Sequence, residues 1–124
     1  MSHDRYPGQL ALPLSFPGRR FRIWSYSPSH SELVLRTEFE PDALHIELLF
    51  KSVHQINLPV ALVGGLMVDI GDPLRGTAGL PFVVRSGHFA GHVIADYLFV
   101  QQEARSRYSP FSLFHGYLRS EFTR

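Results

Sequence analysis

Alternation of apolar and polar residues between positions 21 and 50 constrains the fold of this chain more than any other feature. Apolar side chains recur at every second position in three runs, residues 21–26, 33–39 and 44–50. Because strand side chains point alternately to the two faces, this period of two predicts three half-buried β-strands. The segments between them, 28–32 and 40–43, are short, polar and contain proline, as hairpin loops do. The sequence therefore predicts a three-stranded antiparallel meander.

The register of this meander follows from keeping the apolar faces together, because a one-residue slip would turn a strand inside out. The cross-strand pairs predicted on this basis are Trp24 with Arg36, Arg22 with Glu38, Tyr26 with Val34, Arg36 with Glu47, Glu38 with His45, and Phe39 with Leu44. Arg36 would then lie between the Trp24 ring and the Glu47 carboxylate. Each such contact stabilises a sheet by about 0.2–1 kcal/mol.

The polar side of the meander has two interpretations. It is either a solvated outer sheet surface with ordinary ion pairs, or a recognition surface, since Trp, Tyr and Arg are enriched at binding hot spots. The candidate binding residues on it are Arg22, Trp24, Tyr26, Arg36, Glu38, His45 and Glu47.

The segments on either side of the meander have weaker signals. Residues 10–16 are apolar but interrupted by Pro13, which favours cover for a sheet edge over a central strand. The alternation breaks after Phe50, which predicts a bulge near Lys51 and Ser52. Residues 66–70 resemble a short strand, and 71–79 a mobile loop.

A second strong signal predicts a hairpin from residues 81–86 and 92–100, joined by a glycine-containing turn. The second of these strands is apolar on both faces, which predicts a central strand between two layers. Asp96 in its middle would need partners if it were buried. We therefore expect it to lie near an edge of the layer or to pair with an arginine such as Arg85. Alternatively, Asp96 is a functional acid in a cleft whose mouth carries His88 and His92.

The C-terminal part has a helix-start signal, with Ser109 as N-cap and Pro110 at the first helical position. Phe111, Phe114, Leu118 and Phe122 follow at near-helical spacing, so we expect a short helix at 109–124 that packs its aromatic side on the sheet. A last strand is the rival interpretation, and Gly116 weakens the helix.

Length and composition bound the class of protein. A chain of 124 residues suits one domain, which we divide into an irregular part at 1–20, the meander at 21–58, further strands at 66–103 and the helix or strand at 109–124. A net charge of +1 with mixed signs argues against a nucleic-acid partner. The absence of cysteine fits a reducing cytoplasm, and no apolar run is long enough to span a membrane.

Motifs for catalysis are absent from the sequence. Its seven histidines include His88 and His92, but they lie four apart on a predicted hairpin and lack the helical His-Glu-x-x-His arrangement. No Gly-x-Ser-x-Gly elbow accompanies the serines. We therefore expect no metal and no cofactor, assign no catalytic residue, and favour a binding protein over an enzyme.

Residues 21–36, with the sequence FRIWSYSPSHSELVLR, and residues 91–95, GHVIA, resemble small single-domain β-rich bacterial proteins of unknown function, mainly actinobacterial. The chain is also similar in style to the β-rich immunity proteins of toxin–immunity pairs. The resemblance implies a binding protein, and it transfers no functional residue.

Together these features predict an all-β fold: an antiparallel sandwich or partly closed barrel of six to eight strands, with a short C-terminal helix as an option. The leading functional hypothesis is a protein-interaction module that binds a partner, or a second copy as a homodimer, through the polar-aromatic face. The alternative is a small-molecule binder or enzyme with a pocket between β layers near Asp96, His88 and His92.

Overall fold

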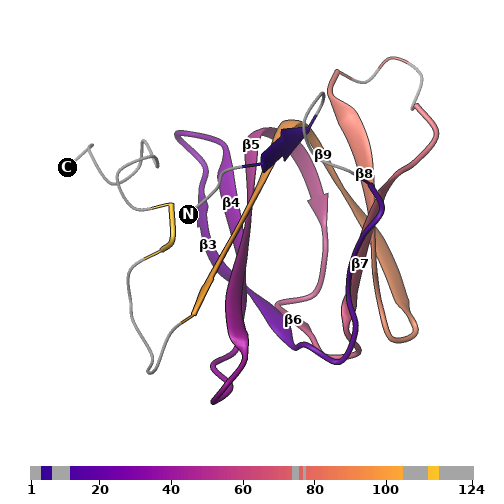
Figure 1. The fold of residues 1–124 in the computed structure, drawn as a ribbon. Helices are drawn as coiled ribbons and strands as arrows, with labels where there is room; N and C mark the ends of the chain where they lie inside the picture. The colour runs from indigo at the N-terminus through magenta and orange to yellow at the C-terminus, as the bar shows by residue number, and fades with distance from the viewer. Residues whose placement is uncertain (1–3, 7–11, 74–75, 77, 105–111, 115–124) are drawn as a thin grey trace.

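A computed structural model describes residues 4–6, 12–73, 76, 78–104 and 112–114 of the chain. These residues form one antiparallel sheet (Figure 1), which confirms the predicted all-β class. Its strands are β1 Asp4–Tyr6, β2 Leu14–Phe16, β3 Phe21–Ser27, β4 Glu32–Thr37, β5 Leu44–Asn57, β6 Ala61–Leu62, β7 Leu66–Ile70, β8 Leu80–Ser86 and β9 Phe89–Ala104. The order across the sheet is β2-β7-β8-β9-β5-β4-β3-β6, and β1 also pairs with β9. The sheet is not closed into a barrel.

The predicted meander is present as β3, β4 and β5, but its first hairpin has a different register. A bulge at Trp24 places Arg22 opposite Arg36 and Tyr26 opposite Leu33. The predicted pairing assumed an uninterrupted ladder and would have put Ile23 opposite a threonine. The bulge instead sets Ile23 opposite Leu35, so that two apolar side chains meet on the core side.

The second hairpin pairs Arg36 with Glu47, as predicted. The ladder between β4 and β5 ends at that pair because β4 ends at Thr37, so the predicted pairs of Glu38 with His45 and Phe39 with Leu44 are not part of it. The backbone N–H of Glu38 donates to Arg20 instead, 2.9 Å away. The β4 chain therefore turns toward the segment before β3 rather than continuing along β5.

The two longest strands, β5 and β9, run side by side through the middle of the sheet (Figure 1) and bend together. Along β5 the core side chains change from even to odd positions, from Phe50 to Val53, and along β9 from Ala95 to Leu98. Ser52 has a left-handed backbone (φ 55°), and the register shifts between Val53 and Gln55, just after the predicted bulge. This change of face places both odd-numbered and even-numbered apolar residues of β9 in the main core, while Phe99 packs on the outer side against a second apolar cluster. The prediction that it separates two layers was wrong, because there is one sheet.

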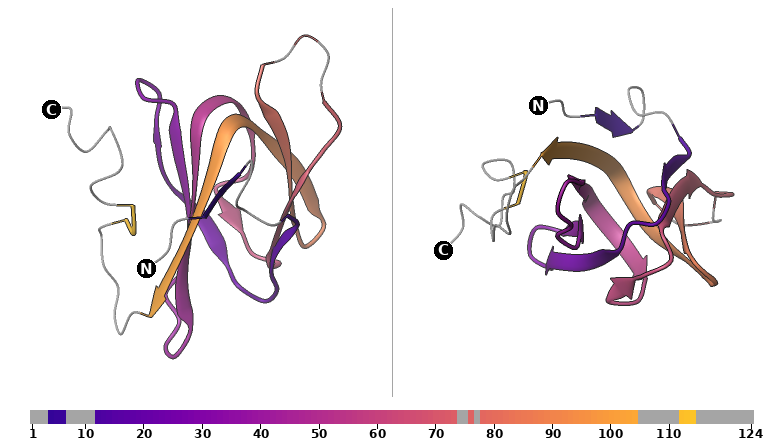
Figure 2. Two further views of the ribbon diagram at one scale, coloured as in Figure 1. Left: turned by 45° about the horizontal axis from the view of Figure 1, so that its top comes forward. Right: turned by 60° about the horizontal axis from the view of Figure 1, so that its bottom comes forward.

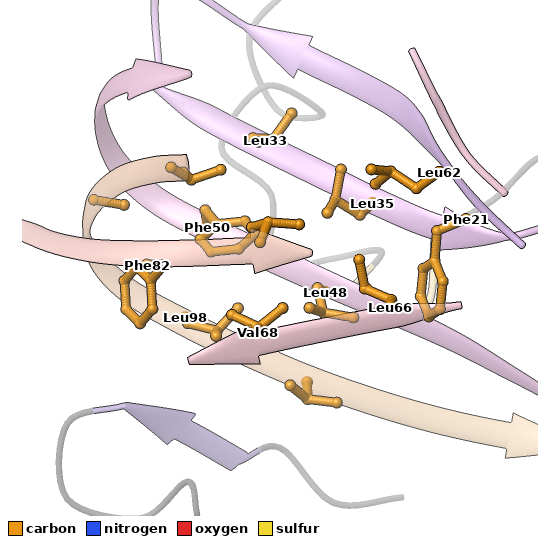
Figure 3. Close-up of a cluster of buried hydrophobic side chains, with 14 of the residues drawn as sticks. Phe21, Leu33, Leu35, Leu48, Phe50, Leu62, Leu66, Val68, Phe82 and Leu98 are labelled. Atoms are coloured by element: carbon orange, nitrogen blue, oxygen red, sulfur yellow. The ribbon is translucent and has the colours of Figure 1, made fainter. Parts of the chain in front are cut away.

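The main core fills the inner, concave side of this sheet (Figure 3). It combines side chains from both halves of the sheet, and the rings of Phe50 and Phe82 meet at 5.5 Å, nearly edge to face. The two ends of the sheet are joined by short chain links, from β2 to β3 and from β6 to β7. Across the first link the Phe16 and Phe21 rings lie 5.6 Å apart. The sheet ends are therefore held together without pairing.

Two tight turns contact each other at the glycines Gly64 and Gly87. The N–H of Gly87 donates to the carbonyl of Gly64 at 3.1 Å, and Ser86 Oγ links the N–H of Gly64 (3.1 Å) to the carbonyl of Gly65 (2.5 Å). A Cβ on Gly64 would lie 2.4 Å from Gly87 Cα. Only glycine, which has no Cβ, permits the two backbones to approach this closely.

Several of the remaining predictions are confirmed, and one concerns residues that mostly lie outside the described part of the chain. β2 lies at the sheet edge, as expected for residues 10–16, and β7 and the β8–β9 hairpin are present. The helix or strand predicted at 109–124 falls mostly outside the described residues. Only residues 112–114 of this range are described, with a turn at 113–114. Among the described residues no helix has the length and apolarity needed to cross a membrane.

Candidate functional site: the outer face of β3, β4, β5 and β9

The outer face is the side of β3, β4, β5 and β9 that points away from the main core. Cross-strand partners share a face, so the register arranges its residues in rows across the strands. One row is polar and consists of Arg22, Arg36, Glu47 and Gln101. The adjacent row is mainly apolar and consists of Ser25, Val34, Leu49 and Phe99. A polar row thus lies directly beside an apolar one.

The polar row contains a buried cluster of Arg36, His45 and Glu47. Glu47 is fully buried and Arg36 is 3% exposed. The Arg36 guanidinium lies 4.2 Å from the Trp24 ring centroid, and its Nε is 3.5 Å from Glu47 Oε2. The predicted position of Arg36 between an aromatic ring and a carboxylate is therefore confirmed. Glu47 is in the predicted register, whereas Trp24 lies at the bulge and not directly opposite Arg36.

Histidine 45 links the cluster to the end of β4. His45 Nε2 lies 2.7 Å from Glu47 Oε2 and 3.1 Å from Arg36 Nε. The same nitrogen cannot donate to the carboxylate and accept from the guanidinium, and two acceptors would repel at 2.7 Å. We therefore assign the Nε2 proton to the bond with Glu47. The other ring nitrogen faces Thr37 Oγ1 at 3.4 Å.

Residues 112–114 cover this face from outside. Figure 2 shows the segment on the side of β4 and β5 that faces away from β7 and β8. Ser112 Oγ donates to Glu47 Oε1 at 2.6 Å and accepts from the N–H of Phe114 at 3.0 Å. The Phe114 ring is 1% exposed and packs with Val34 and Leu49. Trp24 and Phe99 pack against this second apolar cluster. The segment thus places a hydroxyl on the polar row and an aromatic ring on the apolar row.

This cover changes the interpretation of the predicted polar surface. The expected solvated face is wrong for Arg36, His45 and Glu47, which are buried. Alternation alone did not reveal this, because charged residues that satisfy one another in the interior have the same pattern as surface residues. The aromatic spacing after Ser109 did indicate that the C-terminal part packs on the sheet, and Phe114 does so from a turn.

The other candidate residues of this face are dispersed. Arg22 is exposed, across from Arg36. Tyr26 pairs with the core residue Leu33, so it shares the inner side of β3 and is not grouped with Trp24. Glu38 lies beyond the end of β4. Sequence reasoning missed Gln101, whose place in the polar row depends on the pairing of β5 with the distant β9.

The alternative site near Asp96 centres on a partly exposed pair of side chains. Asp96 Oδ1 lies 3.1 Å from His54 Nε2 on the outside of the β5–β9 bend, and both side chains are about two-fifths exposed, 43% and 38%. The expected partner Arg85 is not involved. His88 is exposed in the β8–β9 turn, and His92 lies on β9. The described residues contain no group of three or more potential metal ligands.

A groove of about 520 Å³ lies on the outside of β7 and β8. It is lined by Met67, Asp69, Ile70, Gly71, Asp72, Val83 and Arg85. Its lining includes neither Asp96 nor His88 nor His92, and His92 lies directly opposite the lining residue Val83.

The His54–Asp96 pair should contribute little to stability. Replacing Asp96 with Asn is expected to lower the free energy of unfolding by less than about 1 kcal/mol, because both partners are substantially exposed and screened by water. Urea denaturation followed by circular dichroism measures this. His54→Gln serves as the matched control and should behave alike, and a loss well above that range in either variant would contradict the expectation.

Comparison of the chain with protein-family models, curated proteins and solved structures finds no match. The resemblance to bacterial β-rich proteins and to immunity proteins therefore stays a prediction. The outer face and its cover are the features on which a functional proposal rests.

Proposed function

We propose that this protein is a peptide-binding module whose outer face recognises a short segment with a hydroxyl residue followed, two positions later, by an aromatic residue. The observation that supports it is the seating of residues 112–114. Ser112 and Phe114 fix this segment through side-chain contacts, and none of its residues belongs to a strand of the sheet. Recognition by a few anchored side chains is how short peptides are commonly bound.

The two anchors have different physical roles. Phe114 removes its ring from water among Val34 and Leu49, and such burial contributes about 1.5–3 kcal/mol. Ser112 donates to a carboxylate that is already buried and held by His45 and Arg36. A peptide without the hydroxyl would leave an oxygen of Glu47 dehydrated and unpaired, which costs about 1–3 kcal/mol. The face therefore selects for the hydroxyl as well as for the ring.

In this proposal the chain's own segment occupies the site as an internal competitor. A segment on the same chain acts at an effective concentration on the order of millimolar. A partner protein that presents the same chemistry must therefore compete with it. A second copy of the chain carries the same segment, so self-association is one form that binding could take.

The proposal predicts that loosening the internal segment opens the site. The full chain with Phe114→Ala should bind a labelled heptapeptide of the chain's own residues 109–115, Ser-Pro-Phe-Ser-Leu-Phe-His, at least about tenfold more tightly than the wild type does. Trp24 is the chain's single tryptophan and packs against the Phe114 cluster, so its fluorescence should report occupancy.

Two controls make this test decisive. The peptide Ser-Pro-Phe-Ala-Leu-Ala-His lacks both anchors and should not bind. If Phe114→Ala does not fold, Ser112→Ala removes only the hydroxyl and provides a milder opening. A folded variant that binds no peptide at concentrations of about 1 mM would refute the proposal. Sedimentation of the wild type at rising concentration distinguishes exchange between copies from binding of a separate partner.

A further inference from the structure

Gln101 belongs to the polar row, and contacts with residues 112–114 do not satisfy its side-chain amide. Its side chain is 1% exposed, and neither Oε1 nor Nε2 has a hydrogen-bond partner among the described residues. Buried polar atoms are almost always paired, since each unpaired one loses its hydration without compensation. An entire amide group without partners is therefore unusual enough to require an explanation.

Gln101 borders the buried cluster without hydrogen-bonding to it. Gln101 lies directly opposite Glu47 across β5 and β9. Each Glu47 oxygen already has a partner, Oε1 in Ser112 and Oε2 in His45, and neither pairs with the Gln101 amide. The amide thus sits beside the buried cluster, on the face that the segment covers.

The chemistry of the amide identifies what would complete it. A carboxamide presents N–H donors and a C=O acceptor in one plane, and it is complementary to a backbone peptide group, which also has one donor and one acceptor. A charged ligand is a poorer fit, because the neighbouring Arg36 and Glu47 already neutralise each other at 3.5 Å. A neutral backbone is the partner that this position favours.

We infer that Gln101 is a specificity residue that hydrogen-bonds the backbone of a partner protein's segment, and that the internal segment is an incomplete occupant. This inference rests on the proposed peptide-binding function. The ligand is a peptide with Ser or Thr at the Ser112 position, an aromatic residue at the Phe114 position, and an adjacent peptide group that reaches Gln101. A partner segment that supplies this peptide group makes hydrogen bonds that the internal segment does not make. These additional bonds favour displacement of residues 112–114 by the partner segment.

The test uses the full chain with Phe114→Ala and the probe Gly-Gly-Ser-Leu-Phe-Gly-Gly, whose flexible flanks are free to present a peptide group to Gln101. A second protein carries Gln101→Met as well, which keeps the length of the side chain and removes its polar atoms. The probe should bind about tenfold or more weakly to the Met variant. Gln101→Leu is the alternative if the Met variant does not fold.

An N-methyl scan of the probe locates the backbone contact. Methylation of one peptide nitrogen should weaken binding about tenfold to the protein with Gln101 and leave binding to the Met variant unchanged. Equal probe affinity for both proteins would overturn the inference while leaving the proposed function intact. Absence of probe binding to either protein would overturn the proposed function itself, and the inference with it.

Discussion

Replacing Glu47 with alanine should lower the free energy of unfolding by about 3–5 kcal/mol, because it leaves the buried Arg36 guanidinium without its carboxylate. The same change removes the acceptor for His45 and for Ser112. Most proteins are stable by only about 5–15 kcal/mol, so this loss is a large part of the total. Urea denaturation measures it, and an unchanged slope with denaturant would show that the transition stays two-state.

A matched surface carboxylate provides the control for Glu47. Glu40 pairs with Arg19 at 2.9 Å, but its side chain is 45% exposed. Glu40→Ala should therefore cost less than about 1 kcal/mol. The double variant Arg36→Met with Glu47→Leu should recover most of the loss, since apolar side chains of similar size often replace a buried ion pair without penalty. A Glu47→Ala protein as stable as the Glu40→Ala protein would contradict the buried cluster.

Replacing Gly64 with alanine should also be severely destabilising, by about 3 kcal/mol or more. The added Cβ would lie 2.4 Å from Gly87 Cα and 2.5 Å from Gly87 N, and backbone atoms cannot rotate aside. The two turns would have to separate. That movement breaks the hydrogen bond from Gly87 to Gly64 and both bonds made by Ser86 Oγ.

The other side of the same contact supplies the comparison for Gly64. Gly87 has a left-handed backbone (φ 59°), but a Cβ there would meet only Gly64 Cα, at an ordinary 3.5 Å. Gly87→Ala should therefore cost only the conformational strain of about 1–2 kcal/mol. Thermal unfolding of both variants measures the difference. If Gly87→Ala proves the more damaging of the two, the proposed contact between the turns is wrong.

Local alternation predicted the strands well where one face is apolar and the other polar. The meander and the Leu66–Ile70 strand follow this pattern, whereas the β8–β9 hairpin was predicted from two apolar runs joined by a glycine-containing turn. The pairing of Arg36 with Glu47 also followed from it, because opposite charges and core faces agreed on one register. These features depend on residues that are close in the sequence or that alternate clearly between apolar and polar side chains.

The remaining features depend on contacts that no local pattern carries. The bulge at Trp24 has no glycine or proline to mark it, and it is favoured because it sets Ile23 opposite Leu35. The apolar character of both β9 faces suggested two layers, whereas a bend turns one strand's two faces toward one core. The burial of Glu47 depends on Ser112, far along the chain, and on β9. Charge and alternation alone cannot distinguish this face from an open one.

The position of β9 at the centre of the sheet has a consequence for how the chain acquires its structure. The β3–β4–β5 meander pairs neighbours in sequence, but Leu44 of β5 pairs with Ala104 of β9, and β8 and β1 also pair with β9. Contacts between such distant residues close large loops, and domains rich in them fold in milliseconds to seconds. On a growing polypeptide the meander is complete long before β9 emerges. Until then Val34 and Leu49 lack both the central strand and the Phe114 ring, so the nascent chain passes through a stage at which this apolar row is open to solvent.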